Sequence, residues 1–202
     1  MSDAKLLETR KLVVDFNRRR VIDALDIAVP AGTVYALLGG NGAGKTTTIN
    51  TFLGFVRPAG GEILIDGQSP HGNAGLVRSV VAYLPENVAL YHYMSGRENL
   101  SFFCALAGLQ ITRARAHELL SSAGLQEQAH DQRVSAYSKG MRQKVGLAIA
   151  SAKQAKVTLL DEPTSGLDPS AANDFAQQVR TAAERGMAVL MATHDLFNAI
   201  QV

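Results

Sequence analysis

A glycine-rich segment constrains this chain more than any other feature. Residues 39–46 read Gly-Gly-Asn-Gly-Ala-Gly-Lys-Thr and directly follow an apolar run of strand length at Val34–Leu38. The residues after the segment, Thr46–Phe55, have the character of a helix. A buried strand, a loop of the pattern G-x-x-x-x-G-K-[ST] and a helix, in that order, predict a cradle of backbone amides that holds a phosphate group.

The residue types in this loop suit a triphosphate. Glycine permits positive φ angles and a close approach of the backbone, which we expect at Gly39, Gly42 and Gly44. Lys45 is expected to place its charge between the β- and γ-phosphates, and the Thr46 hydroxyl is a candidate Mg²⁺ ligand. The alternative is a glycine-rich turn without a ligand, which the strand–loop–helix context disfavours. The predicted nucleotide contacts are Gly39, Gly40, Asn41, Gly42, Ala43, Gly44, Lys45, Thr46 and Thr47.

An apolar run that ends in two acids predicts the second half of the site. Residues 157–162 read Val-Thr-Leu-Leu-Asp-Glu. Asp161 is placed to hold Mg²⁺ through water, and Glu162 to polarise an attacking water as a general base. The alternative is a turn that only caps a strand, and the presence of the phosphate loop disfavours it. His194 follows another apolar run and is a candidate to contact a γ-phosphate oxygen or the attacking water, although a lone histidine there is more often structural.

The pattern of the whole chain alternates between strand and helix signals and predicts an α/β fold. Three short strands are expected to form an antiparallel layer, and four buried apolar runs to form a parallel sheet. Between them, residues 89–153 carry three helix signals, including a Ser95–Glu98 capping box, and predict a helical insertion. The expected strands are 11–14, 21–29, 62–65, 34–38, 80–84, 157–160 and 187–192, and the expected helices include 95–107, 112–123, 140–153 and one that starts at Asp168.

Composition narrows the class of protein. The 202 residues are 47% apolar and 19% charged, which is a globular composition. The net charge of +2 argues against a nucleic-acid partner, so we expect Arg18, Arg19 and Arg20 to form a solvated hairpin tip. The one cysteine, Cys104, excludes an internal disulfide and favours a cytoplasmic location. No apolar run approaches the roughly 18 residues of a membrane helix, and the first ten residues lack the order of a secretory signal.

The ordered motifs resemble those of the ATP-binding subunit of ABC transporters over nearly the whole chain. Besides the phosphate loop and the acid pair, residues 137–143 read Tyr-Ser-Lys-Gly-Met-Arg-Gln, which is similar to the family's LSGGQ signature with Ser138 and Gly140 kept. Residues 165–168 match the D-loop, and His194 matches the switch histidine. The resemblance implies an α/β fold: a P-loop NTPase (RecA-like) core with a small antiparallel β layer at 1–88 and 154–202, and an inserted α-helical subdomain at 89–153.

The resemblance also implies a function. It predicts an ATP-hydrolysing motor with ATP and Mg²⁺ as cofactors, bound to a transmembrane permease at the inner face of the membrane. Two copies, expected as a homodimer, would meet head to tail, so that Ser138 and Gly140 of one complete the site of the other. Residues 89–110 and the preceding loop are expected to dock onto a permease helix. Phe16 lies where the family stacks an aromatic ring on adenine, with a core role as the alternative.

Two features depart from the family pattern. Glu86, in residues 83–87, occupies the glutamine position of the Q-loop. It is a candidate Mg²⁺ ligand that brings a charge, and this charge is expected to oppose that of Glu162. The chain also ends at Val202, soon after His194, which suggests a fragment truncated at its C-terminus or a trimmed subunit.

Short runs at 83–91, 94–100 and 137–148 point to a narrower group. They resemble ATPases paired with ABC-2-type permeases and, among these, the copper-processing ATPase of nitrous-oxide-reductase maturation. Copper is not expected to bind this chain, because its single cysteine and its histidines offer no thiolate cluster or histidine pair.

Other functions stay open. A soluble ABC-type ATPase acting on ribosomes or DNA usually has two cassettes or a long coiled-coil insert, and this sequence has neither. A GTPase would need an Asn-Lys-x-Asp run, which is missing, and a kinase would not need residues 137–143. A non-hydrolysing interaction subunit remains possible on the strength of Glu86 and the short C-terminus.

Overall fold

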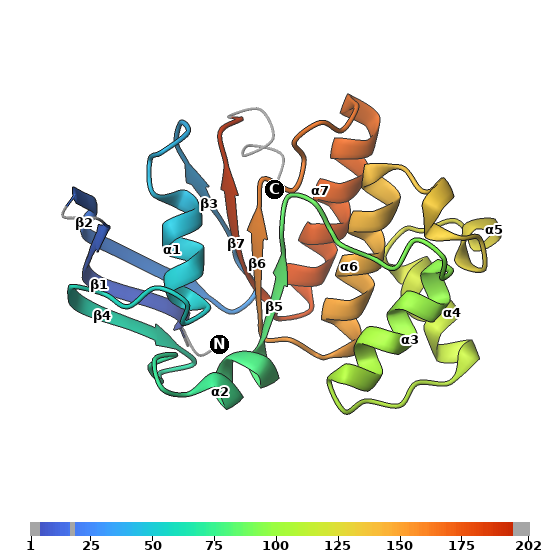
Figure 1. Ribbon diagram of the computed structural model, residues 1–202, viewed down its shortest axis with the longest axis horizontal. Coiled ribbons are helices and arrows are strands. Elements are labelled where there is room, and N and C mark those ends of the chain that lie inside the picture. The colour runs from blue at the N-terminus through green and yellow to red at the C-terminus, as the bar shows by residue number, and fades with distance from the viewer. Residues whose placement is uncertain (1–4, 17–18, 196–202) are drawn as a thin grey trace.

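Two β-sheets and a group of helices make up the molecule (Figure 1). The computed structural model describes residues 5–16 and 19–195. An antiparallel sheet with the order β2-β1-β4 lies beside a parallel sheet with the order β3-β7-β6-β5. The predicted α/β architecture with a separate antiparallel layer is therefore confirmed.

The antiparallel sheet is longer than its sequence signals suggested. It consists of β1 (Lys5–Phe16), β2 (Arg19–Pro30) and β4 (Gly60–Ile65). Leu7 and Thr9 are buried at the two-residue period of a sheet with one covered face, and Leu12 and Val14 resume this period after a register shift. The short 11–14 prediction missed the first half of β1, where the alternation is interrupted by register shifts against β2.

The parallel sheet brings the functional segments to one edge. It consists of β3 (Val34–Leu38), β5 (Val81–Leu84), β6 (Val157–Asp161) and β7 (Ala188–Thr193). Every residue of β6 and β7 is buried, as expected for strands covered on both faces. Because parallel strands all end at the same edge, the segments that follow them, which begin at Gly39, Pro85, Glu162 and His194, converge there.

Helix α1 (Lys45–Phe52) lies between the two sheets. Its Ile49 and Phe52 are fully buried in a cluster that also holds Leu7 of β1 and Leu190 of β7. This packing fixes the start of α1 at the end of β3. The short helix α2 (Ala74–Val80), which no sequence signal predicted, leads into β5.

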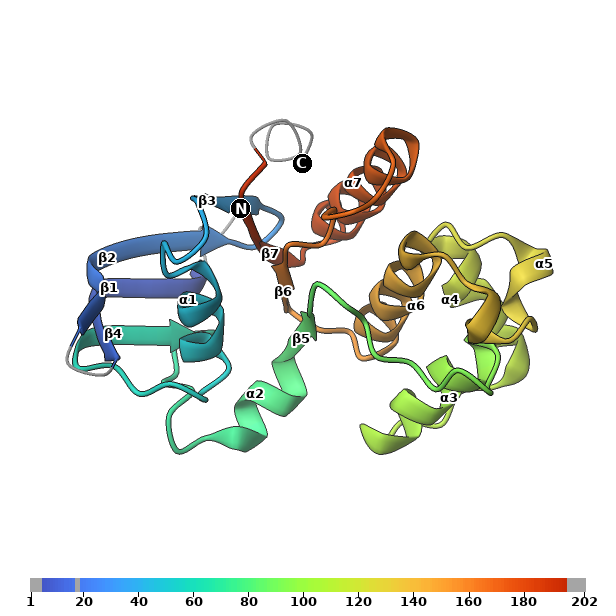
Figure 2. The ribbon, with the colours of Figure 1, turned by 45° about the horizontal axis from the view of Figure 1, so that its top comes forward.

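Of the remaining helices, α6 and α7 pack against the parallel sheet, and the four from α3 to α6 stand apart as a group in Figure 2. They are α3 (Gly96–Leu106), α4 (Arg113–Ser122), the unpredicted α5 (Glu127–His130) and α6 (Lys139–Ala152), with the 3-10 turn η1 (Val134–Ala136) before α6. Both hydrogen bonds of the predicted Ser95–Glu98 capping box are present. Helix α7 (Pro169–Glu184) buries the predicted stripe Phe175, Val179 and Ala183. None of the described helices is long and apolar enough to cross a membrane.

Candidate functional site

The loop between β3 and α1 has the backbone that its glycines predicted, with one correction. Gly42 and Gly44 have φ angles of 80° and 91°, in the left-handed region that glycine tolerates. Gly39 was expected to share this conformation and does not. Glycine is needed at position 39 for lack of room instead, because a Cβ there would lie only 3.0 Å from the Ala43 Cβ. The loop ends at the N-terminus of α1, where the helix dipole favours an anion.

Lys45 is held inside this loop. Its Nζ donates hydrogen bonds to the carbonyl oxygens of Gly39 (2.6 Å) and Gly40 (3.2 Å) and lies 3.2 Å from Oε1 of Glu162. The side chain is only 7% exposed. A buried ammonium group whose donors all meet oxygens is fixed in place, so its charge has a defined position at the floor of the site.

Glu162 adopts a strained backbone that aims its carboxylate across the site. Its φ angle is 47°, which is uncommon for a residue with a side chain. One carboxylate oxygen pairs with Lys45, and the other accepts hydrogen bonds from the backbone amide of His194 (3.3 Å) and lies 2.8 Å from His194 Nδ1. Glu162 therefore links the phosphate loop to the segment that follows β7.

Asp161 meets the first turn of α1. The Thr46 hydroxyl donates a hydrogen bond of 3.3 Å to Asp161 Oδ1. Burial raises the pKa of the Asp161 carboxyl above its usual value, and the Thr46 hydroxyl opposes this shift. A hydroxyl and a carboxylate at this separation are the oxygen donors that a Mg²⁺ ion prefers.

Glu86 comes from a third segment, the loop after β5. Its Oε1 accepts a hydrogen bond from the Ser165 hydroxyl (3.0 Å) and pairs with Lys139 (3.4 Å). These two contacts, the hydroxyl first, lower the pKa of the Glu86 carboxyl. The group therefore carries a negative charge beside Asp161.

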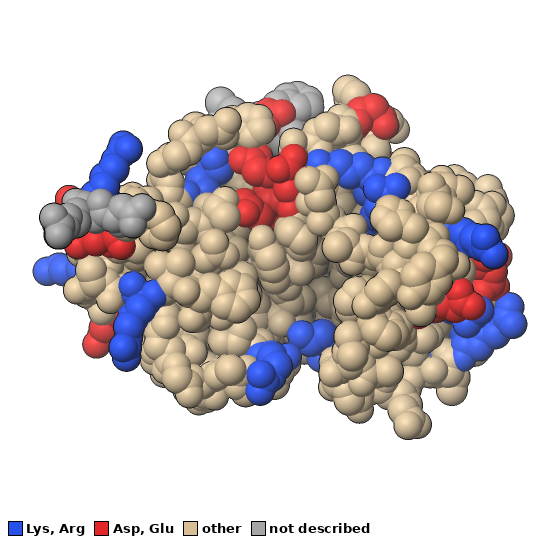
Figure 3. Space-filling model, viewed as in Figure 1, with Lys and Arg blue, Asp and Glu red and all other residues tan. Residues whose placement is uncertain are grey.

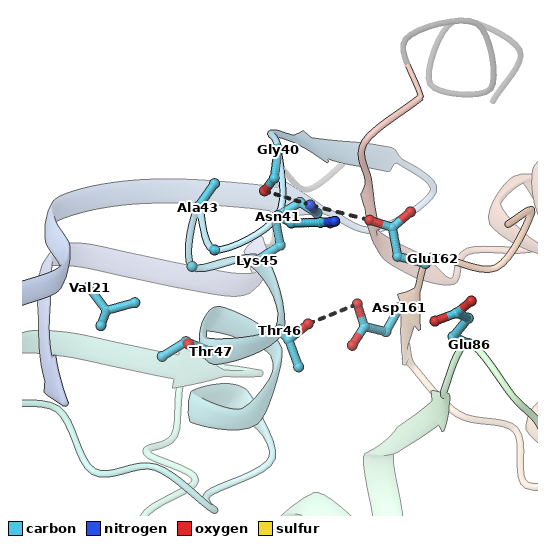
Figure 4. A pocket seen from close by; sticks show the side chains of 12 residues that line it. Val21, Gly40, Asn41, Ala43, Lys45, Thr46, Thr47, Glu86, Asp161 and Glu162 are labelled. Carbon is cyan, nitrogen blue, oxygen red and sulfur yellow. Dashed lines mark hydrogen bonds and ion pairs between the residues drawn. The ribbon is translucent and has the colours of Figure 1, made fainter. Parts of the chain in front are cut away.

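These residues line one open cavity of about 440 Å³ (Figure 4). Its surface carries a gathering of acidic side chains at the top of the central hollow, with basic side chains on both sides (Figure 3). Val21, at the start of β2, also lines the cavity, and sequence reasoning missed it because an apolar strand residue carries no functional signal. The lining residues are Val21, Gly40, Asn41, Gly42, Ala43, Gly44, Lys45, Thr46, Thr47, Glu86, Asp161 and Glu162.

A second hollow of about 460 Å³ adjoins the phosphate loop. It is lined by Phe16, Arg19, Arg20, Val21, Gly42 and Ala43. The Phe16 ring is 60% exposed, which rules out the core role that was its alternative. Arg19 and Arg20 are exposed, as expected for a hairpin tip, and Arg18 lies outside the described residues.

Ser138 and Gly140 do not belong to the cavity. Ser138 caps α6, where its hydroxyl accepts a hydrogen bond from the Met141 amide (3.3 Å). Gly140 is buried in the first turn of the same helix, facing Leu167 and Ala171. Gln143 donates to the carbonyl of Pro163 and so ties α6 to the loop after the acid pair.

Within the described part of the chain, no group of three or more His, Cys, Asp or Glu side chains is arranged to hold a metal ion. The structure does bring together one histidine pair that the sequence did not predict. Nδ1 of His117 and Nδ1 of His130 are 2.9 Å apart, and the other nitrogen of the buried His130 bonds the Leu125 carbonyl.

Comparison with known proteins places this site in a family. The family described as ABC transporter matches residues 22–165. The chain is 36% identical to the ABC transporter ATP-binding protein YhcH of Bacillus subtilis over 192 residues, covering 95% of this chain and 62% of YhcH. It is also 36% identical to the daunorubicin/doxorubicin resistance ATP-binding protein DrrA of Streptomyces peucetius, covering 98% of this chain and 60% of DrrA. The chain thus spans less than two thirds of these relatives.

Solved structures agree. An ATP-binding subunit of an ABC transporter has a TM-score of 0.80 and 31% identity, covering 96% of this chain and 81% of its own. CbiO1 of Clostridium perfringens, part of the ABC transporter complex CbiONQ, matches with a TM-score of 0.84 and 26% identity. The match covers 95% of this chain and 79% of the CbiO1 chain. The predicted ABC-2-type group fits the DrrA match. The phosphate loop, the acid pair and these matches together show that the chain belongs to the ABC transporter family of ATP-binding proteins.

Proposed function

We propose that this chain is the ATP-hydrolysing motor of an ABC transporter. The observation that carries the proposal is the convergence of Lys45, Asp161 and Glu162, which come from segments more than a hundred residues apart, on one cavity. Phosphoryl transfer needs positioning and charge stabilisation more than covalent chemistry, and these are the functions that such a cavity provides.

Each residue then has a role. The amides of Gly40 to Gly44 and the Lys45 ammonium bind the β- and γ-phosphates, and the second hollow, with Phe16 at its edge, receives the adenine. Thr46 and Asp161, with Glu86 beside them, would hold Mg²⁺, whose charge neutralises the phosphate oxygens. Glu162 orients the attacking water and takes its proton, which is worth about 10²–10⁴-fold in rate. His194 already contacts Glu162 and holds this carboxylate in position.

The proposed assembly is a homodimer arranged head to tail. Ser138 and Gly140 stand at the N-terminus of α6, outside this chain's own phosphate cavity, so they are placed to serve a second copy. We propose a core at 1–88 and 154–202 and a helical subdomain at 89–153. We do not propose a nucleic acid as a partner of this chain.

We propose a transmembrane permease as the membrane partner, which places the chain on the cytoplasmic face. An apolar groove of about 410 Å³ supports this, and Figure 3 shows the hollow below the acidic cluster. Its lining includes Pro85 and Val88 from the loop after β5, and Phe103 and Leu106 of α3. Ile149 of α6 lines the groove as well. An apolar helix of the permease fits such a groove.

The test is phosphate release by the purified chain with ATP and Mg²⁺. Wild type should turn over, Lys45→Ala should lose nucleotide binding, and Glu162→Gln should bind ATP without turnover and accumulate as a dimer. Turnover of Glu162→Gln at the wild-type rate would refute the role of Glu162.

A second candidate is an interaction subunit that binds ATP but hydrolyses it slowly or not at all. The charge of Glu86 beside Asp161 and Glu162 favours it. Turnover of ATP by the purified wild-type chain separates the two candidates, because the motor hydrolyses ATP and the interaction subunit binds it with little or no turnover. In the motor, Glu86→Gln should preserve turnover or raise it, and a complete loss would mean that the Glu86 carboxylate itself takes part in the chemistry.

A further inference from the structure

Three separate segments meet at one oxygen atom of Glu86. Lys139, the first residue of α6, places its Nζ 3.4 Å from Glu86 Oε1. The Ser165 hydroxyl donates to the same oxygen at 3.0 Å. The Lys139 Nζ also lies next to Gly166, 4.0 Å from where a Cβ of that residue would stand. The start of α6, the loop after β5 and the loop after β6 are thus joined at this carboxylate.

The charges around the phosphate cavity make this contact consequential. Among the described residues that line the cavity there are three carboxylates, those of Glu86, Asp161 and Glu162, but one lysine and no arginine. Lys45 already pairs with Glu162. Lys139, at the start of α6, is the cation that pairs with the third carboxylate, that of Glu86.

The pair is too exposed to matter much for stability. The side chains of Lys139 and Glu86 are 24% and 48% exposed, and solvent screening leaves ion pairs of this kind with little effect on stability. A flexible, half-exposed glutamate does, however, sample many rotamers unless its partners hold it. Restricting a ligand-bearing side chain to one arrangement lowers the entropic cost of using it.

We propose that Lys139 is a positioning residue for the nucleotide site. With Ser165 it holds Oε1 of Glu86, so that Oε2 is the oxygen left for the cation that accompanies the nucleotide. The inference rests on the proposed function. Lys139 and Glu86 are also the positions where this chain carries Lys for the first Gly of LSGGQ and Glu for the Q-loop glutamine, so two departures from the family motifs form a single contact.

The experiment measures Mn²⁺ affinity by electron paramagnetic resonance in the presence of a slowly hydrolysed ATP analogue. Lys139→Met should weaken Mn²⁺ binding by about tenfold, as loss of a partner that orients a metal ligand commonly does. Lys139→Arg should stay within about twofold of wild type, because it keeps the charge and the hydrogen bond. The matched control is Lys144→Met, on the same helix, where Lys144 lies 3.7 Å from Asp174; it should bind like wild type.

A double variant tests whether Lys139 acts through Glu86. In a Glu86→Gln background, Lys139→Met should cause little further loss, since the ion pair is already absent. Thermal melts of each variant establish that it is folded. Wild-type affinity in Lys139→Met, or an undiminished further loss in the Glu86→Gln background, would overturn the inference alone. A wild-type chain that binds neither Mn²⁺ nor the analogue would overturn the proposed function together with it.

Discussion

Lys45 and Glu162 are coupled by charge, and a double-mutant cycle separates their effect on stability from their effect on nucleotide binding. Lys45→Ala leaves the Glu162 carboxylate, 15% exposed, next to Asp161 without its cation. Removing one partner of a fully buried pair costs about 3–5 kcal/mol, and for a pair that opens on a cavity we expect roughly half, about 2 kcal/mol. For a chain of this size, that lowers the melting temperature by about 4–8 °C.

Glu162→Gln should cost less, about 1 kcal/mol, because Lys45 keeps its hydrogen bonds to the Gly39 and Gly40 carbonyls. The double variant removes both charges of the pair, so that Glu162 is no longer left as a carboxylate without its cation, while Asp161 keeps its hydrogen bond from Thr46. Its loss of stability should therefore be smaller than the sum of the single losses by about 1–2 kcal/mol.

Nucleotide binding should follow a different pattern in the same variants. Titration with ATP should show binding in Glu162→Gln and about a 100-fold or greater loss in Lys45→Ala. The double variant should regain stability but not affinity, because the phosphates still lack the lysine. Additive losses of stability, measured by thermal melts without added nucleotide, would refute the charge coupling. Recovery of binding in the double variant would refute the phosphate role of Lys45.

Three further predictions concern the scaffold. Gly44→Ala forces a side chain into a left-handed backbone with its Cβ 3.1 Å from the Val21 carbonyl, so stability should fall by about 1–2 kcal/mol in denaturant titrations, with weaker ATP binding. Phe175→Ala empties a fully buried site and should cost about 3–5 kcal/mol by the same assay. The Arg97 guanidinium, with Arg113, lowers the pKa of Asp131 below its usual 3.8. The ion pairs of the Asp131 carboxylate therefore stabilise the fold above about pH 3.8, and this contribution is lost as the pH falls through the pKa of Asp131 in the folded protein. Asp131→Asn should lower the melting temperature by about 1–4 °C at pH 7 and by less below pH 3.8.

Local sequence signals predicted those parts of the fold whose conformation depends on interactions between neighbouring residues. The capping box at Ser95, the apolar runs at 157–160 and 187–192, and the glycines of the phosphate loop each specify their own conformation within a few residues. Helices α2 and α5 were missed because they are short and their stability comes from what they pack against.

The sequence by itself determined which residues are available to bind phosphate and in which order they occur, because each motif lies within a few consecutive residues. Only the tertiary structure decided that Glu162 faces both Lys45 and His194, that Lys139 reaches Glu86, and that Val21 borders the cavity. The parallel order β3-β7-β6-β5 brings distant strand ends to one edge, and the packing of α6 beside β5 sets the position of Lys139. Such contacts join residues that are far apart in the chain, 32 positions for Glu162 and His194 and 53 for Glu86 and Lys139, and no local pattern encodes that separation.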